Sequence, residues 1–175
     1  LSDNGVMAIT GEGDPGSMPS TYDFSGNPVQ TVIVGEGITS LPMYAFYGYT
    51  GLKSIRLPDS LRKIGYAAFA NCSELKEIEI PDNLTETATY IVDTGTTVYA
   101  KTGSSAAKAL SKAEMGFRVR GANFTLRYLF DEGGKETGLS LLKADADAAE
   151  VKIPAEVTMI GNGAFSGNSK LKKIE

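Results

Sequence analysis

The stretch Leu52–Glu74, LKSIRLPDSLRKIGYAAFANCSE, decides the fold because its apolar pattern recurs along the chain. The segment 29–51 aligns with it without a gap, at a spacing of 23 residues. The aligned apolar positions are Val29, Val32, Val34, Ile38, Leu41, Ala45 and Phe46 in the first copy and Leu52, Ile55, Leu57, Leu61, Ile64, Ala68 and Phe69 in the second. Recurrence at this period indicates coils that cannot bury their apolar faces alone and that build a shared core by stacking.

Within one coil, the pattern predicts a short strand followed by a return path. Ile55 and Leu57 fall on one face of a strand, and Pro58 ends the strand because proline has no N–H for the ladder. Gly65 then permits a tight corner, and the Ala-Phe pair after it is expected to wedge a ring between coils from a short helical turn. The sequence therefore predicts an α/β repeat solenoid with parallel strands on its concave side and short helical turns on the other.

We divide the chain into five segments on this pattern. Residues 1–28 are expected to form an opening strand and loop that cap the array, and 29–97 form repeat coils, the third of them degenerate. Residues 98–120 are expected to form a strand-helix-strand terminal unit, 121–147 a second opening hairpin, and 148–175 further coils.

The segment GSSAAKALSKAEMG, residues 103–116, predicts an α-helix in mid-chain. Ser104 suits the N-cap, and Gly116 stands where a C-cap glycine belongs. The apolar stripe between them is Ala106, Ala109, Leu110 and Ala113. Because Val98 falls one period after Leu75, we expect the parallel sheet to continue through this unit and the helix to serve as its cap.

The repeat pattern returns in the last part of the chain. The positions that match the second coil are Val151, Ile153, Pro154, Val157, Ile160, Gly161, Ala164 and Phe165. Leu171 and Ile174 begin another coil, which stops at Glu175. We therefore expect either a fragment of a longer array or an end that needs a partner to cover it, with partial disorder over 171–175.

The pattern L-x-x-I-x-L-P-x-x-L-x-x-I-G-x-x-A-F-x-x-C, from Leu52 to Cys72, closely resembles the BspA-type bacterial leucine-rich repeat. The resemblance covers 29–84 and 148–175, and the segment 103–119 is similar to the helical unit that often closes such arrays. It implies a right-handed leucine-rich-repeat solenoid in exported or cell-surface bacterial proteins, often linked to adhesion and protein binding, and it implies no catalytic residues. The first coil departs from the pattern at Gly35, Pro42 and Tyr49.

Composition excludes several classes of function. The chain has 175 residues, a net charge of −4, no histidine and one cysteine. This charge argues against a nucleic-acid binder, and the absence of histidine removes the commonest general base and metal ligand. No apolar stretch is long enough to span a bilayer, and the first residues lack an export signal, which we expect to lie outside this chain. We therefore predict a non-enzyme with no cofactor and no metal, of undetermined oligomeric state.

Two motifs could nevertheless carry chemistry. Ser105 and Lys108 match S-x-x-K, in which a lysine activates a serine nucleophile, but the companion S-D-N and K-T-G elements are absent and a cap helix explains the same residues. Gly11, Gly13 and Gly16 match G-x-G-x-x-G, but Pro15 and Pro19 prevent the helix that would hold phosphates. We interpret the first motif as structure and the second as a loop.

Three weaker signals are also interpreted as structure. Asp145, Asp147 and Glu150 suggest calcium, but an EF-hand ligand position and its central glycine are missing. Cys72 is expected to be a small buried residue, although an activated thiol is the alternative. The sequons at Asn71, Asn83 and Asn123 matter only in a host that glycosylates them.

The outward strand positions form the candidate binding face. They are Gln30, Thr31, Ile33, Lys53, Ser54, Arg56, Lys76, Glu77, Glu79, Glu150 and Lys152. Stacked coils would arrange them as a ladder of mixed charge, which either binds a partner or merely keeps the sheet soluble. Our leading hypothesis is an exported or cell-surface module that binds a protein or glycoprotein through this concave face. The alternatives are a structural spacer in a larger surface protein and, more distantly, a Ser-Lys acyl hydrolase.

Overall fold

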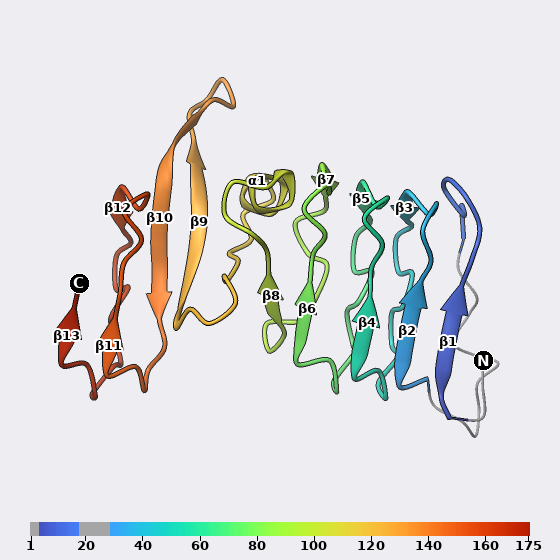
Figure 1. Ribbon diagram of the computed structural model, residues 1–175, viewed down its shortest axis with the longest axis horizontal. Helices are drawn as coiled ribbons and strands as arrows, with labels where there is room; N and C mark the ends of the chain where they lie inside the picture. Colours follow the sequence, from blue (N-terminus) through green and yellow to red (C-terminus); the bar gives the residue numbers. More distant parts are fainter. Residues whose placement is uncertain (1–3, 18–28) are drawn as a thin grey trace.

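The computed structural model, which describes residues 4–17 and 29–175, is an elongated stack of coils (Figure 1). Its first sheet contains β1 (Val6–Ile9), β2 (Thr31–Val34) and β4 (Ser54–Arg56), all parallel. Thr31 pairs with Ser54 across β2 and β4, a separation of 23 residues. The predicted period is therefore the stacking period of the strands.

The strand row continues through β6 (Glu77–Glu79) and β8 (Thr97–Tyr99), which are also parallel. Among the described strands, β4 and β6 are neighbours without a shared ladder, so the row consists of two hydrogen-bonded sheets that meet at a seam. The segment at Arg118 extends the second sheet beyond β8, because the Arg118 N–H donates to the Val98 carbonyl at 2.9 Å. Below, the strand face means the surface formed by the outward side chains of this row.

A second row of two-residue strands runs along another side of the coils. It contains β3 (Ser40–Leu41), β5 (Lys63–Ile64) and β7 (Glu86–Thr87), again parallel and 23 residues apart. The predicted short helical turns are wrong in the described part of the chain. The Ala-Phe pairs lie in turns because their backbone groups bond to the next coil: the Phe46 N–H donates to Ala68 O at 2.7 Å and the Phe69 N–H to Ile91 O at 2.8 Å.

The helix α1 (Ser105–Lys112) is the single helix of the described residues. Its N-cap is Ser104, whose side chain accepts a hydrogen bond from the Ala107 N–H at 3.1 Å, as predicted. The predicted C-cap at Gly116 is wrong. The helix ends earlier, at Lys112 with Ala113 as its C-cap, because the next residue, Glu114, takes the left-handed conformation (φ 60°) that terminates a helix.

The last part of the chain begins with an antiparallel hairpin of β9 (Phe124–Phe130) and β10 (Glu136–Ala144). One edge of β10 pairs in parallel with β12 (Met159–Ile160). The final strands, β11 (Glu150–Val151) and β13 (Lys173–Ile174), form a parallel pair. This pairing is contrary to the disorder expected for residues 171–175.

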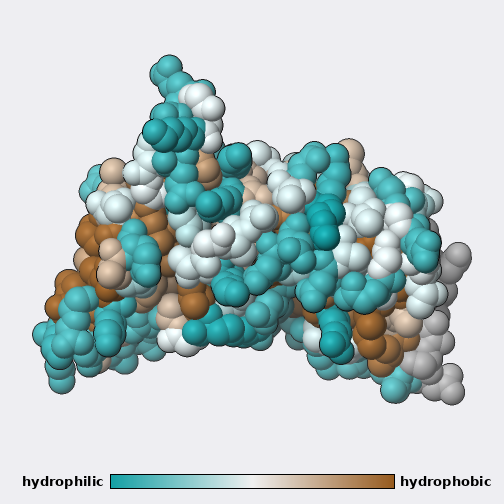
Figure 2. Space-filling model, turned by 45° about the horizontal axis from the view of Figure 1, so that its top comes forward, coloured by the Kyte–Doolittle hydropathy of each residue, from teal (hydrophilic) through white to brown (hydrophobic). Residues whose placement is uncertain are grey.

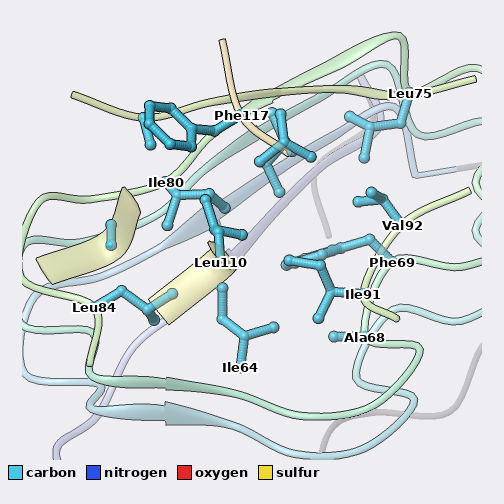
Figure 3. Close-up of a cluster of buried hydrophobic side chains, with 14 of the residues drawn as sticks. Ile64, Ala68, Phe69, Leu75, Ile80, Leu84, Ile91, Val92, Leu110 and Phe117 are labelled. Atoms are coloured by element: carbon cyan, nitrogen blue, oxygen red, sulfur yellow. The ribbon is translucent and has the colours of Figure 1, made fainter. Parts of the chain in front are cut away.

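One apolar core runs through the stacked coils. Figure 3 shows side chains from successive coils converging, with Leu110 of α1 among Ile64, Ile80 and Leu84. The rings of Phe46 and Phe69 stack with centroids 5.6 Å apart, so the repeated phenylalanine does wedge between coils. Each such fully buried side chain contributes about 1.5–3 kcal/mol relative to an exposed one.

Burial declines toward the C-terminal end. Figure 2 shows hydrophobic surface gathered at the end of the molecule that holds β12 and β13. Met159, Ile160 and Ile174 are 51%, 47% and 49% exposed there.

Candidate binding groove on the strand face

The structure divides the predicted binding residues into two groups. One group lies around β2, β4 and β6: Gln30, Thr31, Ile33, Lys53, Ser54, Arg56, Lys76, Glu77 and Glu79. The other group, Glu150 and Lys152, lies at β11, beyond the β9–β10 hairpin (Figure 1). Glu150 there pairs with Lys173 at 3.5 Å. The predicted continuous ladder is therefore interrupted.

A groove of about 490 Å³ opens at the seam between β4 and β6. Predicted residues form much of its wall, and the lining is Lys53, Ser54, Ile55, Arg56, Leu57, Asp59, Glu77, Glu79, Ile80, Pro81, Asp82 and Arg120. Three of these side chains are basic and four are acidic, and both signs face the same hollow. A ligand with charges of both signs fits such a wall better than a polyanion does.

One wall of the groove is held in place by Arg120. Its guanidinium lies 3.8 Å from the centre of the Tyr99 ring and donates to Glu77 at 2.9 Å and to Glu79 at 3.2 Å. The hydrogen bond to Glu77 raises the pKa of Arg120, so this cation stays charged. Surface ion pairs add little stability, and the consequence of this cluster is a fixed geometry for the two carboxylates.

The opposite wall is more open. The Lys53 ammonium donates to Gln30 at 3.0 Å, and the hydroxyls of Thr31 and Ser54 are 3.0 Å apart. Within the described residues, the exposed Arg56 guanidinium has neither a hydrogen-bond nor an ion-pair partner. Arg56 can therefore bind a carboxylate in a bidentate arrangement without first breaking an internal hydrogen bond or ion pair.

Sequence reasoning missed Arg120, Asp59 and Asp82 as groove residues, and it missed Tyr99 as the ring on which Arg120 lies. Asp59 and Asp82 each follow the proline that ends a strand, so their shared position in the repeat could have predicted that they lie together at the end of the strands. Arg120 and Glu77 are 43 residues apart, and no multiple of the 23-residue period joins them. The strand pairing there also departs from the period, since Glu77 pairs with Thr97.

In the Ser105–Lys108 motif, the lysine is held in its charged form, whereas catalysis needs the neutral amine. The Lys108 ammonium donates to Glu136 at 2.8 Å, and this hydrogen bond raises the pKa of Lys108. A lysine that activates serine must lose its proton, which needs a lowered pKa. Both residues lie in the first turn of α1, and the ion pair of Lys108 with Glu136 connects the helix to β10.

The glycine-rich motif forms a loop that packs on the first coil. Within the described residues 11–16 there is no helix, and the Gly13 N–H donates to Gly37 O at 2.8 Å. Pro19, also used in the prediction, lies outside the described residues.

The remaining signals are accounted for by structural contacts. Both carboxylate oxygens of Asp145 accept from Arg118, at 3.0 and 2.8 Å, and no cluster suited to a metal occurs in residues 4–17 and 29–175. Cys72 is buried, as predicted, and this burial raises the pKa of its thiol to about 11. The three sequon amides donate to Tyr47, Asp59 and Glu150. No helix in the described ranges has the length and apolar character needed to cross a membrane.

Comparisons with solved structures find bacterial leucine-rich repeat proteins. One from Eubacterium ventriosum is 21% identical, with a TM-score of 0.42, over 99% of this chain and 56% of that one. A leucine rich cell surface protein from Faecalibacterium prausnitzii is 15% identical, with a TM-score of 0.35, over 99% and 70%. The pneumococcal vaccine antigen PcpA is 17% identical, with a TM-score of 0.40, over 98% and 55%.

The chain thus spans little more than half the length of the first of these structures. A search of curated proteins found no match. The BspA type leucine rich repeat region matches residues 20–99 and 140–175, in six copies. These ranges cover most of the chain and include every coil described above. The chain belongs to the BspA-type leucine-rich repeat family.

Proposed function

We propose that this chain is a non-enzymatic binding module of an exported or cell-surface protein. It captures a protein or glycoprotein through the groove between β4 and β6. The observation that carries the proposal is the unpaired Arg56 guanidinium, which faces carboxylates held by Arg120 across a groove of about 490 Å³. Arginine is enriched among the residues that dominate binding energy, and repeat solenoids offer extended surfaces of this kind.

The test is capture of purified extracellular proteins and glycoproteins by the immobilised chain. Replacing Lys53, Arg56 and Glu79 together by alanine should abolish retention of any partner without lowering the melting temperature, because all three side chains are exposed. The matched control replaces Glu150 and Lys152, which lie outside the groove, and should retain the partner. Equal retention by both variants would reject the groove as the binding surface.

A structural spacer is the second candidate. It is favoured by the charge pairing on the strand face, where Arg120, Glu77 and Glu79 already satisfy one another. A spacer predicts that no extracellular partner is retained by the unmodified chain at all. The division of the chain after residues 28, 97, 120 and 147 also stays a prediction, which limited proteolysis of the intact chain would test.

The acyl hydrolase is the weakest candidate. The ion pair between Lys108 and Glu136 leaves Ser105 without a general base. Covalent labelling of Ser105 by an acylating probe would revive the idea, and absence of labelling would end it.

A further inference from the structure

A row of exposed tyrosines lies on a different side of the coils from the groove. It is formed by the return loops, meaning the segments that lead from β3, β5 and β7 to the next strand of the strand face. The tyrosine row consists of Tyr44, Tyr47, Tyr66 and Tyr90, which are 36–50% exposed. These side chains belong to three successive coils, so the row crosses the stack rather than following one coil.

The rings of the row are in contact from end to end. Tyr44 meets Tyr47 at 5.5 Å and 89°, and it meets Tyr66 at 5.8 Å and 87°, in both cases edge to face. Tyr66 meets Tyr90 at 5.7 Å and 52°. Alternating edges and faces make a notched surface, whereas coplanar rings would make a flat one.

The backbone beneath the row is tied from coil to coil. The Tyr44 N–H donates to Tyr66 O at 2.9 Å, and the Ala67 N–H donates to Tyr90 O at 2.7 Å. The rings are therefore mounted on hydrogen-bonded positions, and little backbone ordering remains to oppose binding.

The fold does not require tyrosine at these positions. Ala67 stands one period after Tyr44 and has the same left-handed backbone, with φ 52° against 58°. In the C-terminal coil, Asn162 and Gly163 occupy the offsets of Tyr66 and Ala67. The coil backbone can therefore form without an aromatic side chain at these offsets.

The row also offers hydrogen-bond donors and a negative charge. In the described structure the hydroxyls of Tyr44 and Tyr66 have no partner, and the Tyr47 hydroxyl only accepts, from Asn71 at 3.3 Å. At the far end, the Tyr90 hydroxyl donates to Asp93 at 2.6 Å. The row then leads into a hollow of about 460 Å³, whose lining includes Tyr90, Val92, Asp93 and Met115.

We propose that the tyrosine row binds a proline-rich peptide segment in the polyproline II conformation, with a basic residue of the peptide near Asp93. Such segments dock in aromatic-lined grooves, and their rings fit notches between aromatic side chains. A polyproline II chain has no internal hydrogen bonds, so its carbonyls can accept from the free tyrosine hydroxyls. Asp93 supplies the complementary charge for lysine or arginine.

The probes are two synthetic peptides, Arg-Arg-(Pro)8 and (Pro)8-Arg-Arg, with Gly-Ser peptides of equal length and charge as controls. The chain has no tryptophan, and four of its eight tyrosines lie in the row, so a change in intrinsic tyrosine fluorescence on binding that the triple alanine variant abolishes can be assigned to the row. We expect saturable binding of at least one proline peptide and none of the controls. Replacing Tyr44, Tyr66 and Tyr90 together by alanine should weaken binding at least about tenfold.

Three further variants separate the parts of the proposal. Tyr66→Phe keeps the ring and should cost less affinity than Tyr66→Ala. Asp93→Asn should weaken binding of the arginine-bearing peptides more than binding of a (Pro)8 peptide without arginine. The groove variant Arg56→Ala should bind the peptides normally, so this surface can fail or succeed independently of the groove.

Several results would overturn the proposal. These are equal binding of the Gly-Ser controls, unchanged binding by the triple alanine variant, or no binding of either proline peptide. Tyrosine-dependent binding of soluble β-glucan oligosaccharides in place of the peptides would assign the row to a glycan. Concentration-dependent self-association that the triple variant abolishes, measured by sedimentation, would assign it to a second copy of the chain.

Discussion

The second coil, 52–74, and the C-terminal coil, 148–170, carry the same apolar offsets but bury them to different extents. Ile64 is 1% exposed in the second coil, whereas Ile160 at the same offset is 47% exposed. Phe69 is fully buried, whereas Phe165 is only partly buried. The second coil has a packed neighbour on each side. Burial in this molecule is therefore a property of the stack and cannot be assigned to a residue type or offset alone.

The largest expected difference between the coils is at the repeated phenylalanine. Phe69→Ala should lower the free energy of unfolding by about 3–5 kcal/mol, because it leaves a cavity among Phe46 and other fully buried side chains. Phe165→Ala should cost at most about half as much, since its ring is already partly in water. Urea denaturation of both variants measures the difference, and equal losses would contradict the comparison.

A smaller difference is expected at the repeated glycine. A Cβ at Gly65 would lie 2.5 Å from Met43 N and 2.6 Å from Pro42 C, both backbone atoms of the neighbouring coil. Gly65→Ala should therefore cost about 1–3 kcal/mol of stability. At Gly161 the closest atom is Leu141 O at 2.9 Å, so Gly161→Ala should cost less. Thermal melts of the two alanine variants would rank them, and the reverse ranking would contradict the steric argument.

Cys72 and Asn168 occupy the same offset in the second and the C-terminal coil. Because only the cysteine can ionise, the stability contributed at this offset depends on pH in the second coil alone. Burial raises the pKa of the Cys72 thiol from 9.0 to about 11, so the folded state holds this proton more tightly than the unfolded state does. Stability supplied by the thiol is therefore present below pH 9 and is lost as pH rises toward 11. Replacing Cys72 by alanine should remove this part of the pH dependence.

Thiol chemistry provides an independent check on Cys72. At pH 8 a disulfide reagent should modify the native thiol far more slowly than the thiol of the chain unfolded in guanidinium, because few native molecules carry the thiolate. Equal rates in the native and unfolded chains would show that the thiol is accessible and ionised in the folded state.

The smallest effect is expected at Ile160. Ile160→Ser should change the free energy of unfolding by no more than about 0.5 kcal/mol, the range of ordinary surface substitutions. Ile64→Ser, the matched change in the second coil, should destabilise strongly because it buries a hydroxyl in place of a packed side chain. A large loss from Ile160→Ser would mean that the C-terminal coil is covered in solution.

Much of the fold could be predicted because one period fixes many contacts at once. The 23-residue spacing placed Ser54 beside Thr31 and put the Phe46 and Phe69 rings in one stack. The N-cap at Ser104 followed from local chemistry alone. The helical turns were mispredicted because local helix preference lost to hydrogen bonds between coils, which a single coil does not reveal.

The candidate site was less accessible to prediction. Outward positions such as Lys53 and Glu77 followed from strand alternation, but the seam between β4 and β6 did not, since the repeat offered no sign of a missing ladder. The hydrogen bond from Arg120 to Glu77 joins residues 43 positions apart. The strands that bring them together do not follow the 23-residue period, since Glu77 pairs with Thr97. The tyrosine row was hidden because its members occupy different offsets in neighbouring coils.

The seam between β4 and β6 has a mechanical consequence. Elsewhere in the row, neighbouring strands are joined by ladder hydrogen bonds, which must break together when the stack is pulled along its axis. At the seam the strand row has no such ladder, and the backbone hydrogen bonds between these two coils lie in the second row, where β5 pairs with β7, and in the return loops. Core side chains also pack between successive coils there (Figure 3). Under tension the strand row should therefore separate first at this seam, while the ladder of β5 with β7 still holds the two coils together. In amide hydrogen exchange, strand-row amides that face the seam should be less protected than those in the ladders of β2 with β4 and of β6 with β8.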